Sequence, residues 1–271
     1  MNYFKIVLFY LFFQLSTFNG YGLNPEKKYN YSASDFSIDI ADSLYLITSD
    51  GYKIFTCFFN PERSNNNKTI IISYGDAGNL SYYFQYARRL TNDGYSVVLF
   101  DYRGFGKSDD FEINKDQIFY NEFEKDLSAV INHTKSKYPQ NKIVIMAFSM
   151  GTILTTLVSD TNPIDFIIAE NFVTDIYAVK DRLENREQNQ STYLLPSDIT
   201  NDEYLSKINK IKIPILIFSS TLDQITTLED SHTLTKNNNC TIIPYEGNHG
   251  CGALTLSDKY FDEINSFLAK N

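Results

Sequence analysis

Met146-Ala147-Phe148-Ser149-Met150-Gly151 is the stretch around which the rest of the chain is organised. The apolar run of residues 142–145 comes before it and predicts a buried strand, and residues 152–158 after it predict a helix. A strand, a sharp corner carrying a serine and then a helix form a nucleophile elbow. Such a corner needs small residues two positions either side of the serine, and Ala147 and Gly151 stand there. The alternative interpretation is that Ser149 only caps the helix.

The composition of the 271-residue chain is that of one globular domain. Hydrophobic residues make up 43% of it, which is enough for the core of a larger α/β domain. The net charge of -9, with no run of lysine or arginine, argues against a nucleic-acid-binding surface and a basic membrane patch. The expected partner is therefore a small molecule and not a nucleic acid.

Residues 1–22 have the layout of a secretory signal peptide. Lys5 precedes a continuous apolar run over residues 6–13, and Gly20-Tyr21-Gly22 supplies small residues for cleavage near Gly22. The run is shorter than the roughly 20 residues that a membrane-spanning helix needs. We therefore expect an exported protein, secreted, periplasmic or in the secretory pathway. An uncleaved anchor, which would be the only membrane contact, is the alternative.

Export would bring the three cysteines into an oxidising compartment. Cys240 and Cys251 flank one predicted strand and loop, so they could form a disulfide that leaves Cys57 unpaired. Three reduced thiols are the other possibility.

The periodicity of the chain changes after residue 60. Alternating apolar residues and the Asp50-Gly51 turn signal predict three antiparallel strands over residues 36–40, 44–47 and 52–59. Beyond them, short apolar runs that predict buried strands alternate with segments that predict helices, and this alternation indicates a mostly parallel sheet with helices on both faces. Residues 171–212 are more polar and are expected to form a short helical cap within a single domain spanning residues 23–271. The predicted strands cover 69–73, 96–100, 142–145, 164–169, 213–218 and 241–245, and the predicted helices cover 80–92, 116–138, 152–158, 228–236 and 256–268.

Three polar residues follow predicted strands of this sheet. Active sites in such sheets lie beyond the carboxyl ends of the strands. Ser149, Asp223 and His249 each fall just after a strand, in the order serine, acid, histidine. Asp175, which follows strand 164–169, is a competing candidate for the acid. The other two histidines, His133 and His232, lie in predicted helices and are expected at the surface.

This order, together with two further motifs, resembles the α/β-hydrolase superfamily. Within it, the chain is most similar to the serine-aminopeptidase-like and monoacylglycerol-lipase-like serine hydrolases. Residues 100–108, Phe-Asp-Tyr-Arg-Gly-Phe-Gly-Lys-Ser, resemble the signature that follows a strand in that branch. Residues 74–79, Tyr-Gly-Asp-Ala-Gly-Asn, line up with its His-Gly-Asn-Ala-Gly-Asn loop. The resemblance runs from about Asp50 to the C-terminus and implies an α/β-hydrolase fold.

The residue types define a mechanism for such an enzyme. Ser149 would attack a carbonyl carbon while His249 accepts its proton, and Asp223 would hold the imidazole in the required tautomer. The backbone N–H groups of Met150 and Asp76 would form the oxyanion hole. Asp101, Arg103 and Ser108 are expected to be structural, with the arginine joining neighbouring loops by bidentate bonds.

Four positions depart from the family pattern. Tyr74 replaces the loop histidine and Asp76 the loop asparagine, while Ser220 stands where a glycine usually precedes the acid and Thr226 where a proline usually follows it. A carboxylate at residue 76 would disfavour a developing oxyanion if its side chain faced the site.

The sequence thus predicts a serine hydrolase that forms a covalent acyl-enzyme, with a carboxylesterase acting on small or medium acyl esters as the first choice. A peptidase or amidase of the same fold is one alternative, and a non-catalytic binding protein of the hydrolase fold is another. No cofactor and no metal are expected, because the sequence shows neither ligand spacing nor a phosphate-binding glycine motif.

Overall fold

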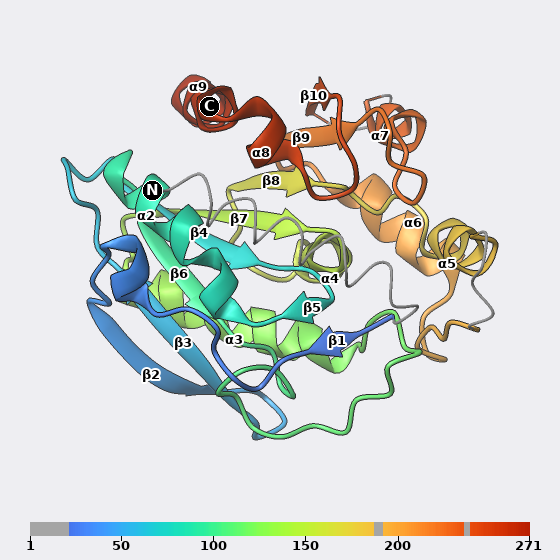
Figure 1. The fold of residues 1–271 in the computed structure, drawn as a ribbon, viewed down its shortest axis with the longest axis horizontal. Helices are drawn as coiled ribbons and strands as arrows, with labels where there is room; N and C mark the ends of the chain where they lie inside the picture. Colours follow the sequence, from blue (N-terminus) through green and yellow to red (C-terminus); the bar gives the residue numbers. More distant parts are fainter. Residues whose placement is uncertain (1–21, 187–191, 236–238) are drawn as a thin grey trace.

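The computed structural model describes residues 22–186, 192–235 and 239–271. The predicted signal peptide therefore lies, up to residue 21, outside the described residues. The centre of the fold is an eight-stranded sheet with the strand order β10-β9-β8-β7-β4-β6-β3-β2 (Figure 1). Its strands pair in parallel from β10 to β6, while β3 pairs antiparallel with both β6 and β2. This is the predicted α/β-hydrolase fold.

The central strands consist of short runs of buried apolar residues. β7 pairs with β4 on one side, Ser73 opposite Ala147, and with β8 on the other, Ala147 opposite Ala169. These small residues stand together at the carboxyl end of the sheet, next to the serine corner. The strands are β2 (Asp42–Ile47), β3 (Lys53–Phe59), β4 (Lys68–Ser73), β6 (Ser96–Phe100), β7 (Lys142–Phe148), β8 (Phe166–Glu170), β9 (Ile215–Ser220) and β10 (Cys240–Tyr245).

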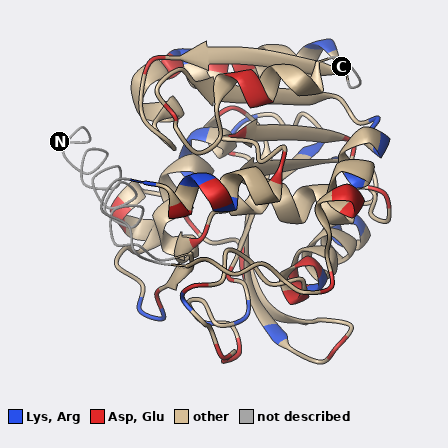
Figure 2. Ribbon diagram, turned by 90° about the vertical axis from the view of Figure 1, so that its right-hand side faces the viewer, with Lys and Arg blue, Asp and Glu red and all other residues tan. Residues whose placement is uncertain are grey.

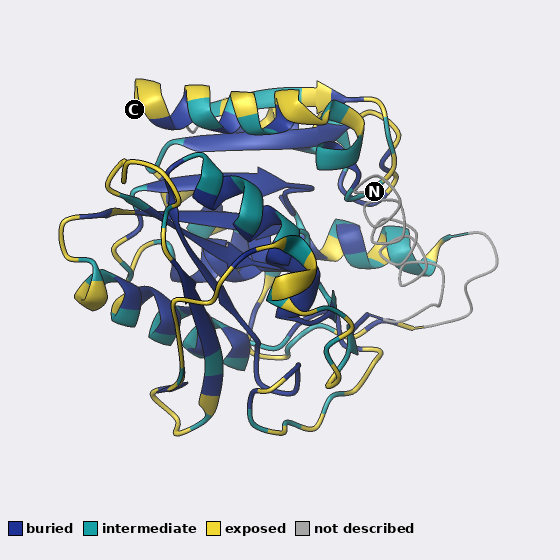
Figure 3. Ribbon diagram, turned by 60° about the vertical axis from the view of Figure 1, so that its left-hand side comes forward, coloured by how far each residue is buried: buried dark blue, intermediate teal, exposed yellow. Residues whose placement is uncertain are grey.

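Helices cover both faces of this sheet. α3 and α4 contact each other on one face, and α6 packs on α4. α2 and α9 share the other face, where the Tyr86 and Tyr260 rings lie 6.4 Å apart. Figure 3 shows the strands as a buried layer between helices whose outer surfaces are exposed. The α-helices are α2 (Phe84–Asn92), α3 (Glu122–Lys137), α4 (Met150–Val158), α5 (Ile176–Glu184), α6 (Asn201–Lys210), α7 (Leu228–Leu234), α8 (Gly252–Leu256) and α9 (Asp258–Lys270).

Two predicted elements differ in the structure. The strand predicted over residues 36–40 is wrong: a short 3-10 helix, η1 (Ala33–Phe36), ends at its first residue, Ser37 follows in the left-handed region at φ 53°, and residues 38–40 form no regular element. The alternation of apolar residues over 36–40, which suggested a strand, includes one buried side chain, that of Ile38. The helix predicted from residue 116 starts only at Glu122, because Gln117 forms a parallel bridge with Leu194.

The segment predicted as a cap carries α5 and α6 in its described part. α6 is tied to the segment that follows β8 through Tyr204, whose hydroxyl donates to the Val173 carbonyl at 2.7 Å. A second, two-stranded sheet joins β1 (Asn24–Pro25) to β5 (Ala77–Gly78), so that the start of the described chain lies beside the loop after β4. Within the described ranges, no helix is long and apolar enough to span a membrane.

Two buried ionic networks hold the loops at the edge of the sheet. The Arg103 guanidinium binds both oxygens of Asp50, at 2.8 and 2.9 Å, and the buried Asp126 at 2.7 and 2.9 Å. The carboxylate of Asp101 accepts from the backbone N–H groups of Leu80 and Lys107. These contacts match the structural role expected for residues 101 and 103. Elsewhere, charges of both signs are scattered over the ribbon (Figure 2).

Candidate active site

The serine corner is strained in the way that the sequence predicts. Ser149 has φ 47° and ψ -114°, in the positive-φ region that a residue other than glycine rarely adopts. The N–H of Ser149 donates to the Glu170 carbonyl at 3.1 Å, and the N–H of Thr152 donates to the Ser149 carbonyl at 2.8 Å. These two hydrogen bonds hold the corner in place. A Cβ at Gly151 would collide with the Ser73 carbonyl. The small residue therefore lets α4 pack directly against β4.

The structure brings Ser149, His249 and Asp223 together from three strand ends. The Ser149 hydroxyl lies 3.1 Å from His249 Nε2, and His249 Nδ1 lies 2.6 Å from the Asp223 carboxylate. Burial disfavours the charged form of both partners, but the attraction between Asp223 and His249 outweighs it. The pKa of Asp223 therefore falls to about 2 and the pKa of His249 is raised. The arrangement is an acid, a base and a hydroxyl in hydrogen-bond contact.

Asp223 is the buried acid of this arrangement, and its own turn supplies several of its donors. The N–H groups of Ile225 and Thr226 donate to one carboxylate oxygen at 2.7 and 3.2 Å. The Thr226 hydroxyl donates to the other oxygen at 2.5 Å. Thr226, one of the departures from the family pattern, thus adds a donor that a proline cannot offer. Ser220, another departure, donates its hydroxyl to the Gly247 carbonyl and so ties the acid turn to the histidine loop.

Two residues at the end of β8 also belong to the site, although no motif in the sequence selects them. The Asn171 side chain donates to Asp223 at 2.8 Å and accepts from the N–H of Gly250 at 2.7 Å. Glu170 accepts from the N–H of Gly252 at 2.6 Å. Both are buried, and their contacts with Gly250 and Gly252 hold the loop that carries His249. Their position after a predicted strand was the one available signal.

The competing candidates lie elsewhere. Asp175 caps the start of α5, where it accepts from the N–H of Ala178 at 2.8 Å. His232 is exposed on α7, and His133 is half-buried beside the Phe58 ring. The prediction of surface positions is therefore confirmed for His232 and only partly for His133.

The cysteines are thiols in this structure. Cys240 and Cys251 are not joined in a disulfide, and Cys57 is buried within the sheet.

The loop after β4 places its two unusual residues differently. Tyr74 turns into the core, where its ring stacks on Tyr83 at 5.3 Å and its hydroxyl lies 3.5 Å from Asp101. Asp76 instead lines the same pocket as Ser149. Burial raises the pKa of the Asp76 carboxyl, against the lowering effect of a hydrogen bond from its own backbone N–H. The Asp76 carboxylate, which would disfavour a developing oxyanion, therefore lies at the site.

A small pocket opens beside the serine. Its volume is about 50 Å³, room for roughly three or four water-sized groups. Asp76, His249 and Arg186 supply its charged groups, while Met150 and several aliphatic side chains make it mainly apolar. The aliphatic lining comes from Ile118, Ile153, Val173, Val179, Leu183 and Ile225.

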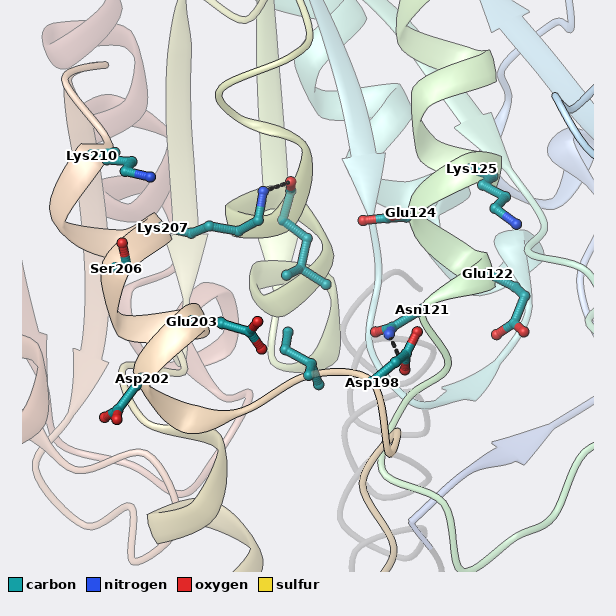
Figure 4. Close-up of a pocket in the computed structure, with 12 residues that line it drawn as sticks. Asn121, Glu122, Glu124, Lys125, Asp198, Asp202, Glu203, Ser206, Lys207 and Lys210 are labelled. Atoms are coloured by element: carbon teal, nitrogen blue, oxygen red, sulfur yellow. Dashed lines mark hydrogen bonds between the residues drawn. The ribbon is translucent and has the colours of Figure 1, made fainter.

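A larger cleft of about 630 Å³ lies between α3 and α6 (Figure 4). Charged residues of both signs line it. Several of its side chains are engaged: for example, Lys207 donates to the Leu157 carbonyl at 3.0 Å and Asn121 to Asp198 at 2.5 Å. None of the predicted site residues is in its lining, so the smaller pocket is the candidate active site.

Comparison with known proteins agrees with the fold. Residues 64–169 match the family model described as serine aminopeptidase, S33. The protein YfhR of Escherichia coli K12, described as uncharacterized, is 26% identical over 200 residues, which cover 72% of this chain and 67% of that protein.

Solved structures are similar over most of the chain. The esterase Pf2001 of Pyrococcus furiosus superposes with a TM-score of 0.74 at 19% identity and covers 92% of this chain and 97% of its own. The esterase EaEST of Exiguobacterium antarcticum gives a TM-score of 0.58 at 16% identity, over 84% of this chain and 98% of its own. At these identities, the similarity to the two solved structures shows the fold. The chain therefore has the α/β-hydrolase fold, and its residues 64–169 are similar to the family of serine aminopeptidases.

Proposed function

We propose that this protein is a serine hydrolase that forms a covalent acyl-enzyme and acts as a carboxylesterase on small or medium acyl esters. The observation that carries the proposal is the continuous contact from Ser149 Oγ to His249 Nε2, at 3.1 Å, and from His249 Nδ1 to Asp223, at 2.6 Å. A base within hydrogen-bond reach of a hydroxyl, itself oriented by a buried carboxylate, is what nucleophilic catalysis by serine requires.

The steps of the reaction follow from this geometry. Ser149 Oγ bonds to the ester carbonyl carbon while its proton passes to His249 Nε2, and Asp223 stabilises the resulting imidazolium. His249 then gives the proton to the leaving alcohol, whose C–O bond breaks. A water molecule, deprotonated by the same histidine, hydrolyses the acyl-enzyme and frees Ser149. The N–H of Met150, at the start of α4, would stabilise the oxyanion.

The pocket supports a short acyl group. Its volume of about 50 Å³ and aliphatic walls suit a small apolar acyl chain better than a long one or a charged residue of a peptide. The family match over residues 64–169 favours a peptide or amide bond as the second candidate. Export, supported by the signal-peptide pattern of residues 1–22, remains part of the proposal.

A fluorophosphonate probe tests the nucleophile. We expect the wild-type protein to be labelled and Ser149→Ala to stay unlabelled. Ser159→Ala is the matched control, because Ser159 lies at the far end of α4 and its hydroxyl donates to the helix carbonyl of Thr156. His249→Ala should label at least about a hundredfold more slowly, since general-base catalysis contributes about 10²–10⁴-fold. Labelling of Ser149→Ala at the wild-type rate would refute the assignment of the nucleophile.

A series of p-nitrophenyl esters of increasing acyl length, with the matching anilides, tests the substrate class. We expect kcat/KM to be highest for chains of about two to four carbons, given the size of the pocket. Anilides hydrolysed faster than the esters would favour the peptidase or amidase.

A further inference from the structure

Asp76 occupies a fixed position beside the nucleophile. It lies in the loop after β4, one residue before β5, and its carbonyl accepts from the N–H of Asn24 at 2.9 Å. It lines one pocket together with Ser149, Met150 and His249. The residue therefore faces the place where an ester carbonyl must lie for Ser149 to attack it.

The backbone N–H of Asp76 interacts with the carboxylate of the same residue and favours its ionised form. The family resemblance assigns that N–H, together with the N–H of Met150, to the oxyanion hole. While the carboxylate is ionised, it holds the very donor that the reaction would use. It also places a negative charge where a second negative charge must develop, and that charge raises the barrier in a pocket with mainly apolar walls.

Three ionisable groups face this carboxyl. His249 and Arg186 interact with it electrostatically and favour its ionised form, and Tyr83, stacked beneath the loop on Tyr74, is close enough for its own pKa to be raised by Asp76. Burial acts in the opposite direction and is the largest effect, so the net pKa of Asp76 lies above its ordinary value. The neutral acid is thus less costly here than on the surface.

We propose that Asp76 is a proton-dependent control of the oxyanion site. Ionised, its carboxylate occupies the N–H donor and repels the oxyanion. Protonated, it releases the N–H, because a carboxylic acid is a much weaker acceptor, and its O–H becomes a further donor. The proton stays on Asp76 throughout the reaction, so only hydrogen bonds change. The proposal rests on the proposed serine hydrolase function.

The active protein then needs two neutral groups. His249 must lose its proton to act as a base, so activity rises with pH on the acid side. Asp76 must keep its proton, so activity falls with pH on the alkaline side. Because the two groups interact, the two limbs of the resulting bell-shaped profile belong to the pair and not to single residues.

Asp76→Asn tests this proposal. The amide cannot ionise and is a weaker acceptor than a carboxylate, so the alkaline limb of kcat/KM for a neutral ester should disappear while the acid limb remains. One oxyanion donor is worth about 10²–10³ in kcat, so at about pH 9 the variant should exceed the wild-type enzyme by at least about tenfold. Asp39→Asn, at an exposed carboxyl outside the pocket, is the control and should keep the wild-type profile.

Asp76→Ala separates the two parts of the proposal. It frees the backbone N–H but supplies no side-chain donor, so it should also lose the alkaline limb and reach a lower plateau than Asp76→Asn. An alkaline limb that persists in both folded variants would overturn the proposal, as would lower activity of both at every pH. If fluorophosphonate labels neither the wild type nor Asp76→Asn at any pH, the serine hydrolase function itself fails. Labelling with an unchanged alkaline limb refutes only the role of Asp76.

Discussion

Asn171 should influence both the rate and the pH dependence of the reaction, although it is not among the residues that line the pocket beside Ser149. Its side chain donates to Asp223 and accepts from the N–H of Gly250, next to the base. A hydrogen bond to a charged group contributes about 1.5–3 kcal/mol and a neutral one about 0.5–1.5 kcal/mol. Asp223 keeps four other donated bonds, so only part of this free energy reaches the transition state.

Asn171→Gly is the appropriate change, because Asn171 has φ 58° and glycine adopts that conformation without strain. We expect kcat/KM to fall by about 10- to 100-fold, which corresponds to about 1.4–2.7 kcal/mol. Loss of the amide donor leaves more negative charge on Asp223 for the imidazolium. The pKa of His249 should therefore rise, and the acid limb of the profile should move to higher pH.

The assay is the pH profile of kcat/KM for a short ester, with the rate of fluorophosphonate labelling measured in parallel. Asn67→Gly is a matched control, since Asn67 has φ 56° and is exposed on a loop outside the pocket. It should change neither quantity. A folded Asn171→Gly protein with activity within about twofold of wild type and an unmoved acid limb would refute the reasoning. A far larger loss in Asn171→Ala than in Asn171→Gly would point to backbone strain instead of the lost hydrogen bonds.

Two further predictions concern stability. Arg103→Met leaves the buried Asp126 without its cation and should lower the free energy of unfolding, measured by urea titration, by about 3–5 kcal/mol. The control Arg63→Met, at an exposed arginine, should change it by less than about 0.5 kcal/mol. Equal effects of the two substitutions would contradict the structural role of Arg103. Gly151→Ala should lower the free energy of unfolding by about 1–3 kcal/mol and also lower activity, because the added Cβ must push α4 away from the Ser73 carbonyl. Wild-type stability and activity in this variant would show that the elbow tolerates the displacement.

The sequence predicts the parallel strands and the residues at their carboxyl ends, because both can be recognised from the local pattern of apolar residues. Ser149, Asp223 and His249 could be selected because buried parallel strands are recognisable as short apolar runs, and because the ends of those strands meet at one edge. The need for a small residue at Gly151 followed from the same corner geometry. These inferences depend on backbone topology, which the order of apolar runs largely determines.

Contacts made across the sheet could not be predicted in the same way. Asn171 and Gly250 are 79 residues apart, and nothing in their local sequences shows that their loops meet. The strand expected at residues 36–40 failed for a local reason, since Ser37 adopts a left-handed conformation that no periodicity reveals. The orientation of Asp76 likewise depended on where a single side chain turned, which the sequence left open.

The pairing of β1 with β5 has a practical consequence for any recombinant form of this protein. Residues 24 and 25 pair with the segment that begins one position after Asp76, and the N–H of Asn24 donates to the carbonyl of Asp76 itself. These few residues contribute little to the core of the sheet. An expression boundary placed after Pro25 would remove these contacts together with the buried Leu23, and would loosen the loop beside the nucleophile. Activity measured on such a truncated protein would be lower than that of the longer chain even where the eight-stranded sheet folds.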